Sequence, residues 1–339
     1  MLTTLHRKNN FDILRLIFAS LVIVSHSFPL TGEKEILSDL TKGQLTFGAL
    51  SVDSFFIMSG YLIFISLKRS NSWLNYLWKR LLRLYPALFI LMLFTLLVVP
   101  FVYTGKNIFH EKLYWTYAPN CLSLYKVQYD IPGVFEKNIY PKAINGSLWS
   151  LSYEFTMYLF LLLLYPLRKS NKALTIIILT FIVSYLLFQF KPYFLKAFLA
   201  SHIYLDAQQL YRLAMFFLSG SILTCINLKK YNTLYIRILL CLALIVSLIF
   251  NFYPIVSPFI LPIIVLFIGT LHTHSITEKL GDISYGVYIY GFIVQQILMF
   301  FFHLNSSSLM VISLLITYIL AYCSWHIIEE RMLKYKNIL

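Results

Sequence analysis

The chain has 339 residues, of which 59% are hydrophobic and only 12% are charged, and its mean hydropathy is +0.74. Soluble domains carry about 25% charged residues, so this composition argues against a soluble protein and predicts an all-α protein that crosses a membrane many times. The formal charge is +14. Because the basic residues stand between apolar runs, as they do in oriented membrane proteins, we expect no nucleic-acid partner.

Ten apolar runs follow one another along the chain, each close to the roughly 20 residues that cross a bilayer. We expect helices at 11–30, 47–67, 84–104, 147–167, 173–190, 210–227, 234–250, 255–271, 283–303 and 309–328. The first run carries Asp12 and Arg15 and has no small-residue cleavage site, which predicts an uncleaved anchor. Since no linker, repeat or appended soluble domain is evident, we expect residues 1–339 to form a single transmembrane domain.

The distribution of lysine and arginine between the loops predicts the orientation. With the N-terminus inside, the inner segments carry 17 of these residues and the outer segments carry nine, all of them Lys. This bias predicts that both chain ends are cytoplasmic, N-in and C-in. The longest loop, 105–146, is then external. Its aromatic residues fit a sugar-binding lid and a simple membrane-surface cap equally well.

Six ionisable residues within or beside the predicted spans are candidates for chemistry, because such groups are costly in a membrane and usually functional there. They are Arg15, His26, Asp53, Arg80, Arg83 and Glu154. On the predicted topology the three arginines lie near the inner boundary and the other three residues lie toward the outside. Arginine suits phosphate oxygens through paired hydrogen bonds, so the arginines predict a site for a phosphate-rich donor. There are ordinary alternatives for all three. Arg80 and Arg83 would only mark the cytoplasmic end of a helix. Arg15 would only form an ion pair with Asp12.

His26 is predicted to act as a general base on a hydroxyl, because imidazole exchanges a proton near neutral pH. Asp53 or Glu154 would orient the ring through its second nitrogen, and the alternative role of Asp53 is a helix N-cap. Arg15 and His26 are eleven residues apart, which places them within about 20° of one helix face and roughly 16 Å apart along it. No motif or spacing predicts a metal site.

The motifs, taken in order, resemble those of acyltransferase family 3, the integral-membrane acyltransferases that O-acylate bacterial cell-surface carbohydrates. They are Arg15 and His26 with ten residues between them, SVDSFFIMSGYLI, Arg80-x-x-Arg83 followed by Tyr85-Pro86, NGSLWSLSYEF, GDISYGVYIYGF and IIEERML. The resemblance implies a ten-helix bundle in the bacterial cytoplasmic (inner) membrane. It also implies acetyl-CoA as the donor substrate, no permanently bound cofactor, and a surface or lipid-linked polysaccharide as the acceptor, with membrane lipid as a further partner.

The same resemblance implies roles for the six candidate residues. His26 would be catalytic, Asp53 and Glu154 would be supporting acids, and Arg15, Arg80 and Arg83 would bind the donor. Two positions depart from the family pattern: Phe155 replaces the second acid of WSLSxEE, and Gly291 stands where members often have a His. The missing His gives more weight to His26.

Two alternatives remain open at this point. A transient acyl-His26 would replace direct transfer to the acceptor hydroxyl. A flippase or exporter of lipid-linked sugars would use the charged residues as a polar pathway across the membrane. No paired half-repeats of the kind common in transporters are evident in the sequence, which favours the enzyme.

Overall fold

The computed structural model describes residues 9–141, 143–271 and 280–338. These residues are helical apart from their connections and one isolated β-bridge between Tyr103 and Val134, so the predicted all-α class is confirmed. The ten main helices are α1 (Phe11–Thr31), α3 (Phe47–Arg69), α4 (Trp73–Val102), α6 (Trp149–Leu163), α7 (Asn171–Phe190), α9 (Ala207–Ile222), α11 (Leu234–Ile249), α12 (Tyr253–Gly269), α14 (Ser284–Phe302) and α15 (Ser306–Ser324).

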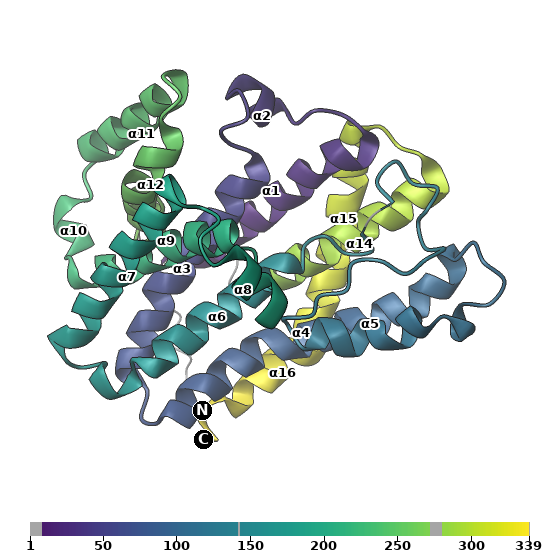
Figure 1. The fold of residues 1–339 in the computed structure, drawn as a ribbon, viewed down its shortest axis with the longest axis horizontal. Coiled ribbons are helices and arrows are strands. Elements are labelled where there is room, and N and C mark those ends of the chain that lie inside the picture. Colours follow the sequence, from purple (N-terminus) through teal and green to yellow (C-terminus); the bar gives the residue numbers. More distant parts are fainter. Residues whose placement is uncertain (1–8, 142, 272–279, 339) are drawn as a thin grey trace.

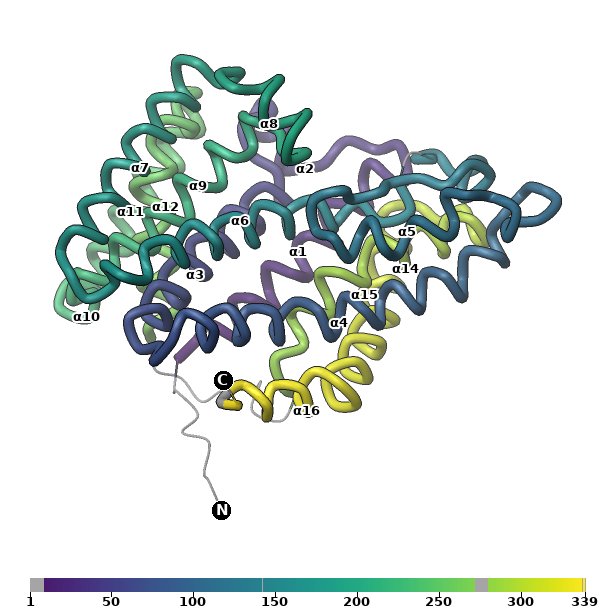
Figure 2. The backbone as a smooth tube through the Cα atoms, turned by 60° about the horizontal axis from the view of Figure 1, so that its bottom comes forward, coloured from purple at the N-terminus to yellow at the C-terminus, as the bar shows by residue number. Residues whose placement is uncertain are grey.

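Shorter helices connect or extend the main ones. They are α2 (Ile36–Leu40), α5 (Lys112–Leu122), α8 (Lys196–His202), α10 (Leu228–Tyr231), a π-helical turn (Trp325–Glu329) and α16 (Glu330–Leu333). Four short 3-10 segments complete the described helical structure, at Ile108–His110, Tyr165–Leu167, Leu223–Cys225 and Lys334–Asn337. In two views α7, α9, α11 and α12 group on one side and α5, α14 and α15 on the other, with α1, α3 and α6 between them (Figure 1, Figure 2).

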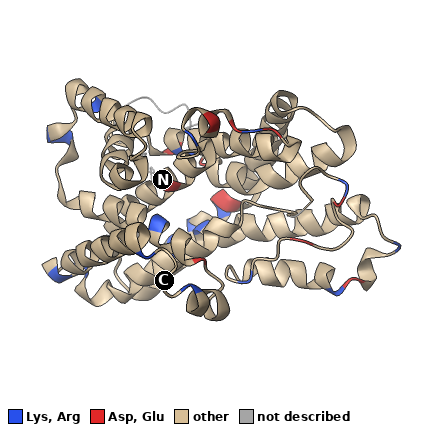
Figure 3. Ribbon diagram, turned by 45° about the horizontal axis from the view of Figure 1, so that its top comes forward, with Lys and Arg blue, Asp and Glu red and all other residues tan. Residues whose placement is uncertain are grey.

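Every predicted run contains a helix, but ten full-length spans are not confirmed. Six stretches of the described chain are long and apolar enough to cross a membrane: Phe11–Thr31, Phe47–Arg69, Trp73–Val102, Asn171–Phe190, Ser284–Phe302 and Ser306–Lys336. The apolar helices α11 and α12 are shorter, and α6 and α9 have 15 and 16 residues. Charged residues are sparse on the ribbon and lie mostly at helix ends and in connections, apart from a small central group (Figure 3).

Helix α4 begins at Trp73, eleven residues before the predicted start at 84. The Ser72 hydroxyl caps it by accepting a hydrogen bond from the Asn75 amide at 2.9 Å. The predicted start is too late because Lys79, Arg80 and Arg83 interrupt the apolar pattern. Both arginines therefore lie inside the helix, three residues apart, and so project from one face of it.

Helix α3 is the central packing element and lies directly against α1 and α9. A side chain at Gly60 would come within 1.8 Å of the Phe217 carbonyl oxygen, and one at Gly220 within 2.1 Å of the Ile57 carbonyl oxygen. Glycine at both positions lets the two helix backbones approach closely, as small residues do in membrane bundles. This close approach fixes the position of α9 relative to α3 and so brings Arg212 of α9 to Asp53 of α3.

The bundle has two chemically different ends. Only residues 70–72 separate α3 from α4, so the end of α3 and the start of α4 lie together. The starts of α1 and α14 join them there, because Arg15 and Arg83 both bond to Asp282. We call this the basic end. The end of α1 and the start of α3 lie at the opposite end, which we call the distal end.

The long connection 103–148 is partly helical. Its helix α5 packs along α4: the Tyr114 hydroxyl donates to the Leu96 carbonyl at 2.9 Å, and the Tyr85 hydroxyl donates to the Leu122 carbonyl at 3.1 Å. These two contacts make α5 antiparallel to α4, as Figure 1 shows. The predicted outer loop therefore covers α4 with part of its length.

Candidate functional site

A cavity of about 260 Å³ reaches the basic end between α1, α3, α4, α6 and α14. Its lining includes five cationic side chains: Arg15, Lys79, Arg80, Arg83 and Lys336. The structure thus brings the three predicted arginines together and adds two lysines that the sequence analysis did not single out. Cations gathered around one cavity attract a polyanion, because low-dielectric walls focus their field. We call this space the basic cavity.

Two of the arginines share one carboxylate oxygen. Arg15 Nη1 lies 2.9 Å and Arg83 Nη2 lies 2.7 Å from Asp282 Oδ2, and Arg15 also bonds to Asp12 at 3.0 Å. Burial alone would raise the pKa of Asp282, but Arg83 and Arg15 outweigh it and lower that pKa. The Asp282 carboxylate is therefore charged and fixes both guanidinium groups in place. Asp282 was not among the predicted candidates, because it lies just outside an apolar run.

Arg80 is held differently. It forms no ion pair with a described carboxylate, and its Nη2 lies a long 3.3 Å from the Ser66 hydroxyl. Its Nε is buried with no hydrogen-bond partner among the described residues, and its guanidinium lies about 6 Å from the rings of Tyr76 and Tyr158. Arg80 is thus a cation in the basic cavity with unused hydrogen-bonding capacity.

Glu154 also lines the basic cavity. Its Oε1 accepts hydrogen bonds from the hydroxyls of Ser59, at 2.9 Å, and Tyr158. The predicted grouping of Glu154 with His26 and Asp53 is wrong. Ser150, Glu154 and Tyr158 follow one another at four-residue spacing, so one face of α6 turns all three toward the cavity. The depth in the membrane that the topology predicts for Glu154 could not show which helices this face of α6 contacts.

His26 lies at the distal end, in a separate cavity of about 500 Å³ between the end of α1 and the segment that leads to α3. The imidazole packs edge-on against Phe292 of α14, with ring centroids 5.0 Å apart. Its Nδ1 is buried and has no hydrogen-bond partner among the described residues. Neither Asp53 nor Glu154 orients the ring in the structure, so that part of the prediction is wrong. The ring is positioned by packing.

Two carboxylates near His26 were not anticipated, because they belong to a loop outside the apolar runs. Glu35 accepts a hydrogen bond from the Phe47 amide at 2.7 Å, and Glu33 accepts from the Ser306 hydroxyl at 2.7 Å. Both residues line the His26 cavity. Burial raises the pKa of Glu35, whereas the hydrogen bonds from Ser306 lower the pKa of Glu33.

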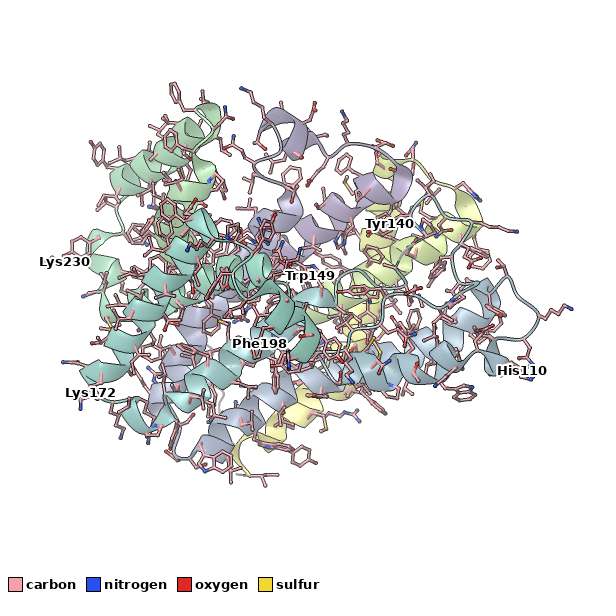
Figure 4. All side chains as sticks on the ribbon, in the orientation of Figure 1. His110, Tyr140, Trp149, Lys172, Phe198 and Lys230 are labelled. Carbon is pink, nitrogen blue, oxygen red and sulfur yellow. The ribbon has the colours of Figure 1, made fainter. Side chains whose placement is uncertain are left out.

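The residues that line the His26 cavity all fall between Ser25 and Thr46, so the predicted lid 105–146 contributes none of them. The loop reaches this region in a second layer, where the Tyr140 ring packs on Phe292 with centroids 6.3 Å apart. Figure 4 shows Tyr140 beside the end of α1. A sugar-binding lid is therefore not formed by this loop over His26 in the structure.

Asp53 faces a third cavity, of about 170 Å³, between α3, α9 and α12. Its Oδ1 lies 3.5 Å from Nε of Arg212 on α9, a residue that was not among the predicted candidates. The alternative role as a helix cap is wrong, because α3 begins at Phe47 and Thr46 caps it. His26, Asp53 and Glu154 thus belong to three different cavities.

Helix α1 connects two of these sites. It is continuous from Phe11 to Thr31, so Arg15 and His26 lie on one rigid element roughly 16 Å apart along its axis. The arrangement combines a cationic cavity at one end with a nitrogen of a packed imidazole at the other. Such a pair of sites can bind an anionic carrier and deprotonate a second molecule.

Comparison with known proteins gives the family. The family profile described as an acyltransferase domain matches residues 8–326. An O-acetyl transferase of Shigella phage Sf6 is 28% identical over 337 residues, which are 97% of this chain and 97% of that protein. Nodulation protein 10 of Rhizobium leguminosarum bv. viciae is 31% identical over 184 residues, 49% of this chain and 46% of that protein. No solved structure gives a significant match.

The profile covers nearly the whole chain, and its boundaries enclose the basic cavity, the His26 cavity and the Asp53 cavity almost entirely. Together with the six helices in the described ranges that are apolar enough to cross a membrane, this match identifies a membrane protein. The chain therefore belongs to acyltransferase family 3, as its motifs predict, and it is an acyltransferase.

Proposed function

We propose that this protein is a membrane O-acetyltransferase that moves an acetyl group from cytoplasmic acetyl-CoA to a hydroxyl of an extracytoplasmic or lipid-linked polysaccharide. The observation that carries the proposal is the placement of Arg15 and His26 at the two ends of α1, one in the basic cavity and the other in a separate distal cavity. The Shigella phage relative, named as an O-acetyl transferase, supports the reaction class. The excess of basic residues in the predicted inner segments supports a cytoplasmic entry for the donor.

The basic cavity is the proposed donor site. Acetyl-CoA carries its phosphates at one end and its thioester at the other, so a cationic cavity can hold the nucleotide part while the acyl end extends along the bundle. Arg80 is free to bond to a phosphate, whereas Asp282 already holds Arg15 and Arg83 in position. Preorganised cations of this kind bind an anion with little reorganisation.

His26 is the proposed base. It takes the proton of the acceptor hydroxyl, and the hydroxyl oxygen attacks the thioester carbonyl carbon. The carbon–sulfur bond breaks, the ester forms, and the CoA sulfur leaves with the proton that His26 carried. Glu154 lies on the donor side, where we propose that it positions the acyl end of the donor through Tyr158. Asp53 takes no part in orienting His26, because it faces a different cavity and pairs with Arg212.

The test is an assay on purified protein in lipid nanodiscs with acetyl-CoA and the surface glycan of a strain that lacks the gene. We expect release of CoA thiol together with acetyl groups on the glycan, measured by mass spectrometry and NMR. Thiol release no higher than the background rate with any acyl-CoA would overturn the proposal in favour of a flippase. Release of CoA thiol with another acyl-CoA but not with acetyl-CoA would show that the transferred group is not acetyl, and the rest of the proposal would stand.

A further inference from the structure

The cavity at Asp53 contains polar atoms that nothing in the described chain satisfies. Asp53 Oδ1, Arg212 Nε, Gln209 Oε1 and Tyr253 Oη are all buried and have no hydrogen-bond partner at normal geometry. All four residues line this one cavity. Buried polar groups in native proteins are almost always paired, so a cluster of unpaired ones indicates a bound polar molecule.

The ion pair in this cavity has room for such a molecule. Asp53 and Arg212 approach to 3.5 Å without a hydrogen bond, and the Asp53 side chain is only 5% exposed. The cavity volume of about 170 Å³ is more than ten times the roughly 10–15 Å³ that one water molecule needs. The space therefore fits a ring-sized ligand.

The lining defines the chemistry of that ligand. Asp53 and Arg212 are its only charged residues among those described, and they neutralise each other, so a charged ligand would leave one charge unpaired. The unpaired atoms include acceptors on Asp53 and Gln209 and donors on Arg212 and Tyr253. The remaining wall is largely apolar, with Phe188, Met215, Phe216 and two prolines. A neutral sugar ring matches this combination, because its hydroxyls donate and accept while its faces are apolar.

The cavity also adjoins the His26 cavity. Thr46 lines the His26 cavity, Gln44, Leu45 and Ala49 line the Asp53 cavity, and the Thr46 hydroxyl accepts a hydrogen bond from the Ala49 amide at 2.8 Å. The first turn of α3 is therefore the wall between the two spaces. Both lie at the distal end, where the proposed function places the acceptor.

We propose that the Asp53–Arg212 cavity is a second acceptor subsite, which binds a neutral sugar residue of the glycan next to the one that is acylated at His26. This inference rests on the proposed function. It gives Asp53 a role in acceptor binding, and it explains why a buried ion pair with open hydrogen-bonding positions lies about two helical turns from Thr46 and the His26 cavity. It also predicts that the enzyme prefers an extended acceptor over a single sugar.

Tyr253 allows a sharp test, because its hydroxyl makes no hydrogen bond at normal geometry that Tyr253→Phe would remove. The acceptors are the methyl glycoside of the sugar that carries the acyl group and the shortest oligosaccharide that extends it on both sides. We measure kcat/KM for CoA thiol release with each. In the wild type the oligosaccharide should be preferred, and in Tyr253→Phe that preference should fall roughly three- to tenfold, the value of one hydrogen bond.

Tyr185→Phe is the matched control, since the Tyr185 hydroxyl donates to the Ile255 carbonyl at 3.3 Å outside this cavity. It should keep the wild-type preference. A wild type without any preference, or a Tyr253→Phe variant with an unchanged preference, would overturn the second subsite. If the wild type releases no thiol with either acceptor, the proposed function itself fails, which is a different result.

Discussion

Arg83 and Asp282, 199 residues apart in the sequence, meet at 2.7 Å at the basic end of the bundle, and Arg15 bonds to the same carboxylate oxygen. The side chains of Asp282 and Arg83 are only 17% and 23% exposed. One carboxylate thus ties α1 and α4 to the start of α14 and holds two of the cations that line the basic cavity. This contact organises the proposed donor site.

Asp282→Asn should destabilise the protein by about 2 kcal/mol, because two partly buried cations lose their counter-charge. Added CoA should recover more stability in the variant than in the wild type, since its phosphates can replace the missing carboxylate. Thermal unfolding in detergent, with and without CoA, measures both effects. Equal stabilisation by CoA in the two proteins would contradict a donor site at these arginines.

Arg80→Gln should raise the KM for acetyl-CoA roughly 10- to 100-fold, the value of a charged hydrogen bond to phosphate. The unfolding temperature should hardly change, because Arg80 forms no ion pair with a described carboxylate. Arg168→Gln is the matched control: Arg168 bonds to the Tyr165 carbonyl and does not line the cavity. Equal KM values for the two variants would remove Arg80 from the donor site.

The helical runs and the face shared by Arg15 and His26 were predictable, because hydropathy and the period of 3.6 residues are properties of local sequence. The start of α4 was not predictable in this way, since the basic residues in its first three turns are helical but break the apolar pattern. Local sequence also gave no sign that the connection 103–148 would form a helix packed along α4.

The grouping of the candidate residues was predictable only in part. Arg15, Arg80 and Arg83 meet in one cavity, because all lie near the same ends of neighbouring helices. Glu154 joins them, and Asp53 pairs with Arg212, 159 residues away, because rotation of each helix about its axis decides which side chains meet. That rotation depends on tertiary packing, here on the close contact of Gly60 and Gly220 between α3 and α9.

Glu154→Gln tests the electrostatics of the basic cavity. The amide oxygen of Gln can still accept the hydrogen bonds of Ser59 and Tyr158, so the fold should be preserved. Removing the negative charge should lower the Kd for acetyl-CoA roughly threefold or more, because the carboxylate repels the donor phosphates that the cations hold elsewhere in the same cavity. Isothermal titration measures this. Glu330→Gln, an exposed residue paired with His326 outside the cavity, should leave the Kd unchanged, and weaker binding in Glu154→Gln would contradict the expectation.

Glu33 and Glu35 should give stability opposite dependences on pH. Burial raises the pKa of Glu35 above its ordinary 4.5, so its contribution to stability is present below that value and is lost as pH rises through the folded-state pKa. Hydrogen bonds from Ser306 lower the pKa of Glu33, so its contribution is present above 4.5 and is lost as pH falls. Unfolding temperatures measured from about pH 3 to 8 should therefore show a loss of stability at the acid end that disappears in Glu33→Gln and a loss toward higher pH that disappears in Glu35→Gln. Identical profiles in both variants would exclude these assignments.

His26→Ala and His26→Gln should each lower the rate of acetyl transfer by about 10²- to 10⁴-fold, the usual contribution of a general base. Acetyl-CoA binding should persist, because His26 does not line the basic cavity. His110→Ala is the matched control, since His110 is exposed at the far edge of the molecule (Figure 4). Acetyl groups on the glycan, counted by mass spectrometry at equal protein levels, should disappear only in the His26 variants. Undiminished acetylation in both of them would exclude His26 as the base, whatever its packing against Phe292.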